Sequence, residues 1–302
     1  MVLLVTGAWK EAQMYVSVLE SKGHQVYFMQ NEIESLPCAS DVIEGVICNG
    51  LFLHHDIQTF TNLKYIQLTS AGLDRVPMEY IRSHNITINN ARGVYSIPMA
   101  EYAICGVLQL YKKVSSFYEN KKMHLWEKNR NLFELYGKQV CIVGCGSVGT
   151  ECAKRFKAFG CIVRGIDEVR DGTNNCFDEI LQPKHLQSEL SQADVVVLTL
   201  PLTEETKGMF GHEMFQYIKT GAIFVNIARG LLVNEQALVK ALKNHLMGAV
   251  LDVFEQEPLS VESAFWDMDN VIITPHNSFV SDGNDRRLGK IIMDNLDEQE
   301  EL

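Results

Sequence analysis

Short apolar runs alternate with amphipathic stretches from the first residue of the chain onward. Between the runs, residues 10–22 and 77–83 repeat apolar side chains at helical spacing. The apolar runs have the length of β-strands and occupy residues 2–5, 25–29, 46–48, 65–68 and 86–89. Such an alternation predicts a parallel β-sheet covered by helices.

A long helix separates this series from a second one. We predict that the helix begins near Pro98, with Ser96 as its N-cap, because the apolar positions from Met99 to Leu110 keep helical spacing. Polar, lysine-rich sequence follows at residues 112–131. The second series is rich in valine and isoleucine, as strands buried on both faces are. Its strand-length runs occupy residues 140–143, 161–166, 194–200, 222–227, 249–253 and 271–274.

Both ends of the chain are predicted from local patterns. Residues 1–7 have no basic leader and are typical of a first β-strand rather than of a secretory signal. The last helix is predicted at residues 285–296, and we expect the acidic tail at 297–302 to be solvated and frayed. No apolar run approaches the roughly 18 residues that a membrane span requires.

Composition narrows the class of protein. The 302 residues are 46% hydrophobic and 22% charged, which is typical of a globular protein, and this length favours two domains. The 38 acidic residues exceed the 27 basic ones and give a net charge of −11. That charge argues against nucleic acid or an anionic membrane as the main partner, although one basic pocket is compatible with it.

The eight cysteines and nine histidines show no metal or disulfide pattern. No two cysteines form a C-x-x-C pair, and most lie in apolar strand or helix patterns. Thiols in a reducing, cytoplasmic compartment are therefore favoured over a disulfide framework. The histidines show no H-x-x-x-H spacing, so we expect no metal site.

Residues 140–149 carry a dinucleotide-binding pattern. The run at 140–143 leads into Gly144, Gly146 and Gly149, a G-x-G-x-x-G motif that precedes a predicted helix. Asp167 closes the next predicted strand, 18 residues after Gly149, where an acidic side chain accepts hydrogen bonds from ribose. The glycines permit a tight turn and a close approach to pyrophosphate, and the helix N-terminus offers amide donors. The alternative is a glycine turn that binds nothing.

Asp167 also bears on the choice of cofactor. Its carboxylate would repel the 2′-phosphate of NADP, and Glu168 would add to that repulsion, so NAD is favoured. Arg164 and Arg170 lie close enough in the sequence to oppose the effect. Alternatively, Asp167 is a solvent-facing residue at a strand end.

Three further predicted strands lead to polar residues, Arg229, Glu257 and His276. Ligands of open α/β sheets bind at the carboxyl ends of the strands. Arg229 would hold a carboxylate or polarise a carbonyl, His276 would supply or remove a proton, and Glu257 would hold the imidazolium. Taken singly, Arg229 also fits a surface ion pair, Glu257 a helix entry and His276 a simple turn. Together, after a dinucleotide motif, they favour reduction of a keto acid.

These segments resemble the D-isomer-specific 2-hydroxyacid dehydrogenases, a family that includes phosphoglycerate, glyoxylate/hydroxypyruvate and D-lactate dehydrogenases. The resemblance covers about residues 65–296. The motifs that carry it lie at residues 63–74, 90–101, 135–149, 200–206, 226–230, 251–259 and 274–276. It implies an α/β fold with two domains. A Rossmann-type, doubly wound parallel-sheet domain (98–282) is inserted in a smaller, flavodoxin-like substrate domain (1–97 and 283–302).

The resemblance also assigns roles to residues. The catalytic positions of the family match Arg229, Glu257 and His276. Besides Gly144, Gly146 and Gly149, its NAD-contacting positions match Ser147, Val148, Asp167, Leu200, Ala228 and Asp252. Backbone amides at Ala71 and Gly72 would grip the substrate carboxylate in a cleft that closes on binding. The long helix and the arm around Trp126 resemble the dimer contact of the family, although Trp126 equally fits a core position.

We therefore expect an NADH-linked reductase of a small 2-keto acid, reversible to oxidation of a D-2-hydroxy acid such as a hydroxypyruvate-, glyoxylate- or phosphoglycerate-like compound. The alternative is a non-catalytic, NAD-sensing interaction protein of the corepressor type. The acidic charge and the intact Arg-Glu-His set favour the enzyme. Formate is disfavoured because formate dehydrogenases of this superfamily carry glutamine at the position of Glu257. Family members usually continue beyond the segment that matches residues 295–296, so this chain is either cut short or lacks the segment that closes its first domain.

Overall fold

The computed structural model describes residues 1–73, 75–169 and 175–300. Asp74 and Arg170, the latter a residue that bears on cofactor choice, lie outside the described residues. The chain divides into two compact units. The first unit combines Met1–Tyr95 with Ser281–Leu302, and the second unit is Ser96–Val280.

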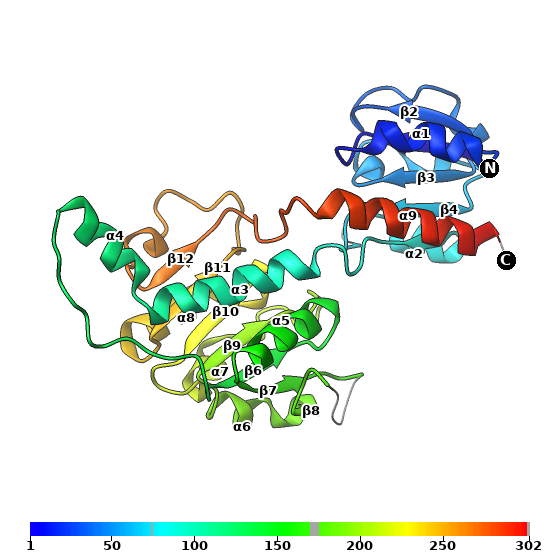
Figure 1. Cartoon of the computed structure of the whole chain (residues 1–302). Helices are drawn as coiled ribbons and strands as arrows, with labels where there is room; N and C mark the ends of the chain where they lie inside the picture. Colours follow the sequence, from blue (N-terminus) through cyan, green and yellow to red (C-terminus); the bar gives the residue numbers. More distant parts are fainter. Residues whose placement is uncertain (74, 170–174, 301–302) are drawn as a thin grey trace. The chain divides into compact units, whose positions relative to one another are not determined.

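The described part of the first unit holds a five-stranded parallel sheet in the order β2-β1-β3-β4-β5 (Figure 1). Its strands are β1 (Val2–Thr6), β2 (Gln25–Met29), β3 (Gly45–Cys48), β4 (Tyr65–Leu68) and β5 (Thr87–Asn89). Its helices are α1 (Ala12–Ser21), α2 (Met78–Ser83), α9 (Asn284–Glu300) and the short 3₁₀ turns η1 (Ser40–Val42), η2 (Leu51–Leu53) and η3 (Ile57–Thr59). This strand order is the flavodoxin-like one, with the winding reversed between β1 and β3.

Helices cover both faces of this sheet because its strands carry apolar side chains on both sides. Leu3 of β1 points to one face, where it packs in one cluster with Leu288 and Ile292 of α9. Ile66 of β4 lies on the other face with Ile81 of α2. A helix from the far end of the sequence therefore completes the core of the first unit.

The described part of the second unit holds a seven-stranded parallel sheet in the order β12-β11-β10-β9-β6-β7-β8. Its strands are β6 (Gln139–Val143), β7 (Ile162–Ile166), β8 (Glu179–Leu181), β9 (Val195–Leu198), β10 (Ile223–Asn226), β11 (Gly248–Leu251) and β12 (Val271–Ile273). The chain enters at β6, winds to one edge, returns beside β6 at β9 and winds to the other edge. The predicted doubly wound α/β fold is thereby confirmed.

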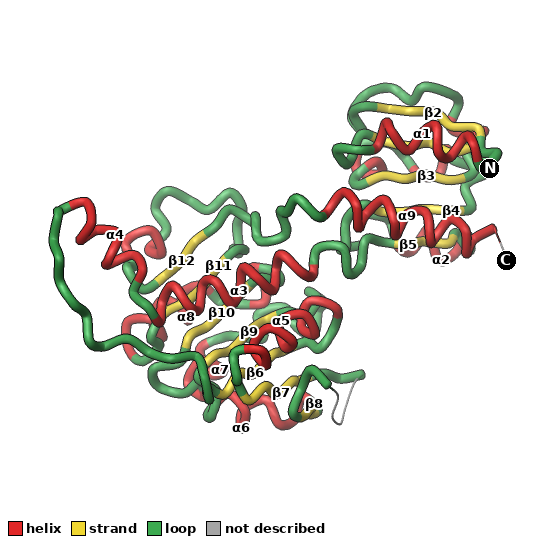
Figure 2. The backbone as a smooth tube through the Cα atoms, in the orientation of Figure 1, coloured by secondary structure: helices red, strands yellow, loops and turns green. Residues whose placement is uncertain are grey.

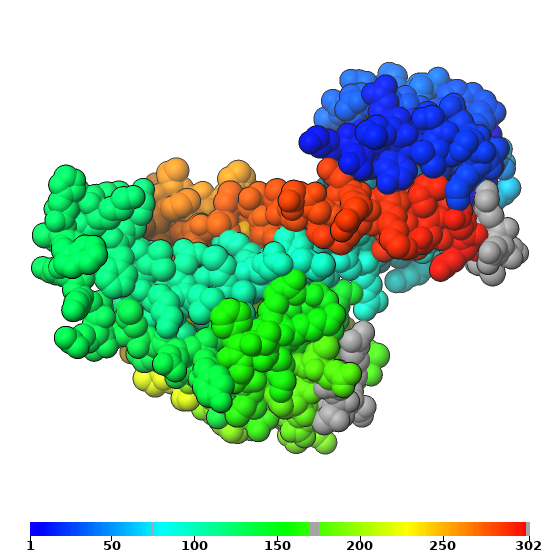
Figure 3. All heavy atoms as spheres, viewed as in Figure 1, coloured from blue at the N-terminus to red at the C-terminus, as the bar shows by residue number. Residues whose placement is uncertain are grey.

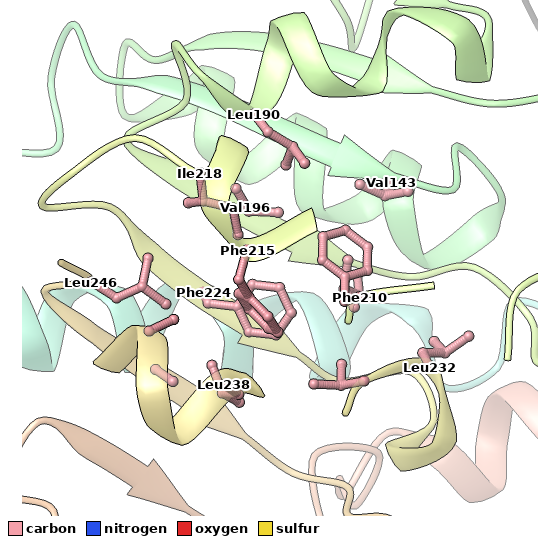
Figure 4. Close-up of a cluster of buried hydrophobic side chains, with 14 of the residues drawn as sticks. Val143, Leu190, Val196, Phe210, Phe215, Ile218, Phe224, Leu232, Leu238 and Leu246 are labelled. Atoms are coloured by element: carbon pink, nitrogen blue, oxygen red, sulfur yellow. The ribbon is translucent and has the colours of Figure 1, made fainter. Parts of the chain in front are cut away.

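Helices lie on both faces of the second sheet (Figure 1). The described helices of this unit are α3 (Ser96–Tyr111), α4 (Val114–Lys122), α5 (Ser147–Ala158), α6 (Leu186–Leu190), α7 (His212–Tyr217), α8 (Glu235–Asn244) and the 3₁₀ turns η4 (Pro183–His185), η5 (Gly230–Leu232) and η6 (Ala264–Asp267), of which α4 does not pack on the sheet. On one face, Phe224 of β10 packs against Phe215 of α7, with ring centroids 5.1 Å apart (Figure 4). On the other, Gly106 of α3 lies so close to Val250 that a Cβ at Gly106 would be 2.6 Å from it.

The segment after α3 forms an arm, which we define as residues 114–136. Lys113 leaves α3 in the left-handed conformation (φ 50°), and α4 begins at the next residue. In Figure 2, α4 and the long loop after it stand away from the sheet of the second unit, and Figure 3 shows the same arm as spheres. Trp126 is 95% exposed there, so the core alternative for this residue is wrong.

Several predicted boundaries are corrected by the structure. Ser96 is a buried residue in the first turn of α3 rather than its N-cap, and Pro98 lies in the same turn. The polar stretch at 112–131 contains α4, and β8 is a three-residue strand that no apolar run predicts. The acidic tail is not frayed from residue 297, since α9 continues to Glu300 and Asp297 pairs with Lys22, the residue after α1.

Candidate active site

The glycine motif forms the turn between β6 and α5. Gly144 has φ 98°, and a Cβ there would lie 2.7 Å from the backbone nitrogen of Leu200. A Cβ at Gly149 would lie 2.1 Å from the carbonyl oxygen of Gly144. Gly146 differs, since a Cβ there would meet nothing within 4 Å. The fold itself therefore requires Gly144 and Gly149, whereas the surroundings of Gly146 leave room for a ligand.

The N-terminus of α5 lies at this open glycine. Gly146 is the N-cap residue, and no side chain caps the helix in the described structure. The first-turn amides of a helix have no partner within the helix and attract anions such as phosphate. Ser147 and Val148 supply those amides, and both residues are partly exposed.

Asp167 lies beside the same turn, at the end of β7. Its Oδ2 accepts a hydrogen bond of 2.7 Å from the backbone nitrogen of Cys145, and its Oδ1 accepts one of 3.0 Å from that of Val169. The side chain is thus directed towards the glycine turn instead of pointing away into solvent. The structure brings the acidic residue and the glycine motif together, as the spacing predicts.

Arg229 follows β10 in a turn that a buried amide holds. The side chain of Asn226 donates to the carbonyl oxygen of Arg229 (3.0 Å) and accepts from the backbone nitrogen of Ala228 (3.1 Å). The Arg229 guanidinium in turn donates to the carbonyl oxygen of Ala228 at 2.8 Å. Gly230 packs directly against the backbone of the loop after β11, since a Cβ at Gly230 would lie 1.8 Å from the Phe254 carbonyl oxygen.

Glu257 and His276 form a hydrogen-bonded pair. Oε2 of Glu257 lies 2.8 Å from Nδ1 of His276, and its Oε1 accepts a hydrogen bond from the backbone nitrogen of Phe254. Both side chains are partly exposed, 37% for Glu257 and 43% for His276. The pair therefore lies where a solute can reach the second ring nitrogen, Nε2.

The backbone around His276 is fixed by Asp252, a fully buried residue after β11. The carbonyl oxygen of Asp252 accepts from the His276 nitrogen at 2.8 Å. Its carboxylate accepts from the backbone nitrogens of Asn277 (2.7 Å) and Ser278 (3.0 Å). Within this set, His276 adopts a left-handed conformation with φ 51°, which is uncommon for a residue other than glycine.

The predicted site residues divide between the two units. Those of the glycine motif, Asp167, Leu200, Ala228, Arg229, Asp252, Glu257 and His276 all belong to the second unit. Ala71 and Gly72 belong to the first unit, in the turn after β4, so they are not among the residues that the second unit brings together. That turn is braced by Asn90, whose amide donates to the Ala71 carbonyl oxygen at 2.7 Å, and by Ser70, whose hydroxyl donates to the Gly72 carbonyl oxygen at 3.1 Å.

Sequence reasoning missed the residues that hold this site in place. Asn226, Gly230 and Thr274 lie inside the motifs of the family without an assigned role, and Tyr102 lies among the apolar positions of the predicted long helix. None of these side chains is ionised at neutral pH, so no acid–base or charge pattern in the sequence indicates them.

Two further features concern partners. No helix in residues 1–73, 75–169 and 175–300 is both long and apolar enough to cross a membrane. Within the same residues, no three His, Cys, Asp or Glu side chains are grouped so that they could hold a metal ion.

The chain is similar in sequence to one family model and to several known enzymes. The family model for the NAD-binding domain of the D-isomer specific 2-hydroxyacid dehydrogenases matches residues 104–278. A glyoxylate reductase of Pyrococcus furiosus is 35% identical over 234 residues, 73% of this chain and 69% of that protein. A D-3-phosphoglycerate dehydrogenase of Archaeoglobus fulgidus is 32% identical over 244 residues, 80% of this chain and 46% of that protein.

A solved structure agrees over nearly the whole chain. The D-isomer specific 2-hydroxyacid dehydrogenase family protein from Aeromonas salmonicida has a TM-score of 0.83 and 30% identity, and the match covers 98% of this chain and 94% of that one. The chain spans less than half the length of the two D-3-phosphoglycerate dehydrogenases of Archaeoglobus fulgidus and Bacillus subtilis.

Proposed function

Because the chain belongs to the D-isomer-specific 2-hydroxyacid dehydrogenase family, we propose that it transfers a hydride between NAD(H) and a small 2-keto or D-2-hydroxy acid. The observation that carries the proposal is the contact of 2.8 Å between Nδ1 of His276 and Oε2 of Glu257. It lies at the carboxyl ends of the parallel strands, the edge where Arg229 and the glycine turn also lie. A proton donor, an anion-binding group and a dinucleotide turn at one edge are what keto-acid reduction requires.

The residues of the turn fit a dinucleotide. The space at Gly146 would admit a pyrophosphate, the amides of Ser147 and Val148 would bind it, and Asp167 would accept from the adenosine ribose. We propose Gly144, Gly149, Leu200, Ala228 and Asp252 as further residues of the NAD site, with Asp252 also holding the loop of His276. When bound, the nicotinamide supplies or accepts the hydride.

The contact with Glu257 supports a role for one particular nitrogen of His276. Nδ1 is engaged with Glu257, so Nε2 is the nitrogen that would give its proton to the keto oxygen during reduction and take one back during oxidation. Glu257 would hold the ring in this orientation. Arg229 would hold the substrate carboxylate through its planar fork of donors, and we propose the backbone amides of Ala71 and Gly72 as a further grip on it.

The substrate class rests on relatives. By their names, the relatives from Pyrococcus furiosus and Archaeoglobus fulgidus act on glyoxylate and D-3-phosphoglycerate, and a third relative is an (S)-sulfolactate dehydrogenase of Chromohalobacter salexigens. All are small 2-hydroxy acids or the matching keto acids. We propose a hydroxypyruvate-, glyoxylate- or phosphoglycerate-like substrate for this chain.

Oxidation of NADH, followed by absorbance, tests the activity on glyoxylate, hydroxypyruvate, pyruvate, branched 2-keto acids and phosphohydroxypyruvate. At least one acid should be reduced by the wild type, and His276→Ala should lower kcat by about 10²–10⁴-fold. His212→Ala, a change at an exposed histidine at the start of α7, is the matched control and should leave turnover unchanged. If NADH binds but no acid is reduced, the chain is better described as the NAD-sensing interaction protein.

The partner that we propose is a second copy of the chain, bound through α3 and the arm at 114–136. The arm exposes large apolar side chains, among them Tyr118 (57%), Trp126 (95%) and Tyr136 (76%). A cleft of about 800 Å³ lies between α4 and the segment around Trp126. Exposed apolar surface of this kind marks interaction sites.

Sedimentation equilibrium tests the dimer. The wild type should have about twice the chain mass of 34.1 kDa, and Trp126→Glu should shift it towards the monomer. Val261→Glu, at a side chain that is 92% exposed outside the arm, is the control and should leave the mass unchanged. A monomeric wild type would contradict the proposal. We also propose a cytoplasmic location, which the absence of any disulfide among the eight described cysteines supports.

A further inference from the structure

A row of hydroxyl groups leads from α3 to the buried carboxylate of Asp252. The Tyr102 hydroxyl lies 2.7 Å from Oγ1 of Thr274, and Oγ1 of Thr274 lies 2.5 Å from Oδ1 of Asp252. Tyr102 belongs to α3, Thr274 directly follows β12 and Asp252 directly follows β11. Three segments far apart in the sequence therefore meet in one hydrogen-bonded row behind the loop of His276.

The direction of these hydrogen bonds follows from the chemistry of the groups. Asp252 receives N–H groups on both carboxylate oxygens, which suits the ionised form, and an ionised carboxylate only accepts. The single hydrogen of the Thr274 hydroxyl therefore goes to Asp252, and the Thr274 oxygen accepts the hydrogen of Tyr102. Burial raises the pKa of Tyr102 to about 12, so its hydroxyl keeps that hydrogen at neutral pH.

Asp252 connects this row to His276. Its backbone oxygen accepts from the His276 nitrogen at 2.8 Å, and its carboxylate accepts from the backbone nitrogens of Asn277 and Ser278. His276 has φ 51°, a conformation that is unfavourable for a residue other than glycine and persists only where the surroundings hold it. Asp252 is the group that holds it, and Thr274 and Tyr102 fix the orientation of Asp252.

We propose that Tyr102 and Thr274 are positioning residues for His276, acting through Asp252 rather than on substrate or cofactor. The inference rests on the proposed function, in which Nε2 of His276 moves the proton. Without the Thr274 hydroxyl, one oxygen of Asp252 loses a donor and the carboxylate can rotate away from the amides of Asn277 and Ser278. The imidazole then spends less time at the point where it meets the keto oxygen, and turnover falls while substrate binding is retained.

Four variants test the row. Thr274→Val keeps the shape and removes the hydroxyl, Thr274→Ser restores the hydroxyl, and Tyr102→Phe removes the outer one. Tyr111→Phe is the matched control, because Tyr111 is a buried tyrosine of the same helix that packs in the core. The measurement is kcat and KM for the keto acid that the wild type reduces, on protein whose NADH-binding sites have been counted by fluorescence titration.

Displacement of a catalytic group by about 1 Å lowers turnover by about 10²-fold. We therefore expect kcat to fall about 10- to 100-fold in Thr274→Val and about 3- to 10-fold in Tyr102→Phe, with KM within about twofold of wild type. Thr274→Ser should stay within about threefold of wild type in both constants, and Tyr111→Phe within about twofold.

Amide hydrogen exchange in the protein without cofactor gives a readout that needs no activity. The amides of residues 276–278 should exchange about tenfold faster in Thr274→Val than in Thr274→Ser, as expected when roughly 1.4 kcal/mol of local protection is lost. The strands of the second sheet should keep their wild-type protection. Faster exchange throughout the unit would instead mark a general loss of stability.

The inference is overturned if Thr274→Val turns over as fast as Thr274→Ser, if the loss lies in KM, or if Tyr111→Phe matches Tyr102→Phe. Should Thr274→Val fail to fold, Tyr102→Phe carries the same test with its ring packing intact. A wild type that reduces no keto acid would refute the proposed function alone, and the exchange of residues 276–278 would still decide whether the row holds the loop.

Discussion

Gly230→Ala should damage catalysis more than stability, because Gly230 lies between the two loops that carry Arg229 and Glu257. The new methyl carbon would lie 1.8 Å from the Phe254 carbonyl oxygen, 1.9 Å from its carbon and 2.6 Å from the Glu255 nitrogen. All three atoms are backbone, so no side chain can turn away. Ordinary contact begins near 3.4 Å, and the loops must therefore separate by about 1.6 Å.

A separation of this size displaces Arg229 relative to the Glu257–His276 pair. Since about 1 Å of misplacement costs about 10²-fold in rate, kcat/KM for keto-acid reduction should fall by about 100-fold or more. Overpacking of this kind costs about 1–3 kcal/mol of unfolding free energy. NADH affinity should fall less than kcat/KM, because the glycine turn and Asp167 lie on other strands, while Ala228 and Asp252 lie beside the displaced loops.

The assay combines steady-state kinetics, NADH fluorescence titration and thermal unfolding. Gly211→Ala is the matched control, since a Cβ there would be 3.7 Å from its nearest neighbour, the Gly208 carbonyl oxygen, and Gly211 caps α7. It should cost up to about 1 kcal/mol of stability and no activity. The reasoning is refuted if Gly230→Ala keeps wild-type kcat/KM, or if Gly211→Ala loses activity to the same extent.

Three further predictions concern single side chains. Asp167→Ala should lower NADH affinity and raise the NADPH/NADH preference by about tenfold each, or 1.4 kcal/mol, as measured by kinetics with both cofactors; an unchanged preference would assign the selection to another residue. Arg229→Lys keeps the charge but loses the planar fork, so kcat/KM should fall by about 10²-fold while NADH binding is kept; near-normal turnover with lysine would refute the role. Burial alone would raise the pKa of Asp194, but hydrogen bonds from Lys219 (2.8 Å) and the Gln139 nitrogen (2.9 Å) lower it. Asp194→Asn should therefore cost about 1–2 kcal/mol in denaturant unfolding at pH 7, a gap that closes as pH falls below about 4, because the stabilisation is lost once the carboxyl is protonated. A gap independent of pH would show that the charge plays no part.

The order of strands and helices followed from the sequence because buried parallel strands leave a strong signal. Apart from Gln139 and Asn226, the residues of β6, β9 and β10 are all apolar, and each strand is fully or almost fully buried. β8 left no such signal, since it has three residues and only Ile180 is buried. The helix α4 was missed for a related reason. It buries no residue, so apolar periodicity could not reveal it.

The polar residues of the candidate site could also be predicted. Arg229, Glu257 and His276 follow β10, β11 and β12, and the carboxyl ends of parallel strands meet at one edge. The positioning groups could not be predicted, because their importance arises only from contacts between distant parts of the sequence. Gly230 matters through its approach to Phe254, and Tyr102 through a hydroxyl that reaches Thr274, 172 residues later. No local sequence pattern indicates a contact between residues so far apart in the chain.

The pH dependence of kcat/KM for keto-acid reduction, in wild type and in Glu257→Gln, tests most directly whether His276 gives the proton with Glu257 as its partner. Reduction takes a proton from Nε2 of His276, whose Nδ1 lies 2.8 Å from Oε2 of Glu257, so activity should have a falling limb at high pH. Glutamine keeps the shape of Glu257 but not its charge, so the falling limb should lie at lower pH in Glu257→Gln. Oxidation of the hydroxy acid returns the proton to the same nitrogen and should rise where reduction falls. Superimposable limbs in the two proteins would contradict the account.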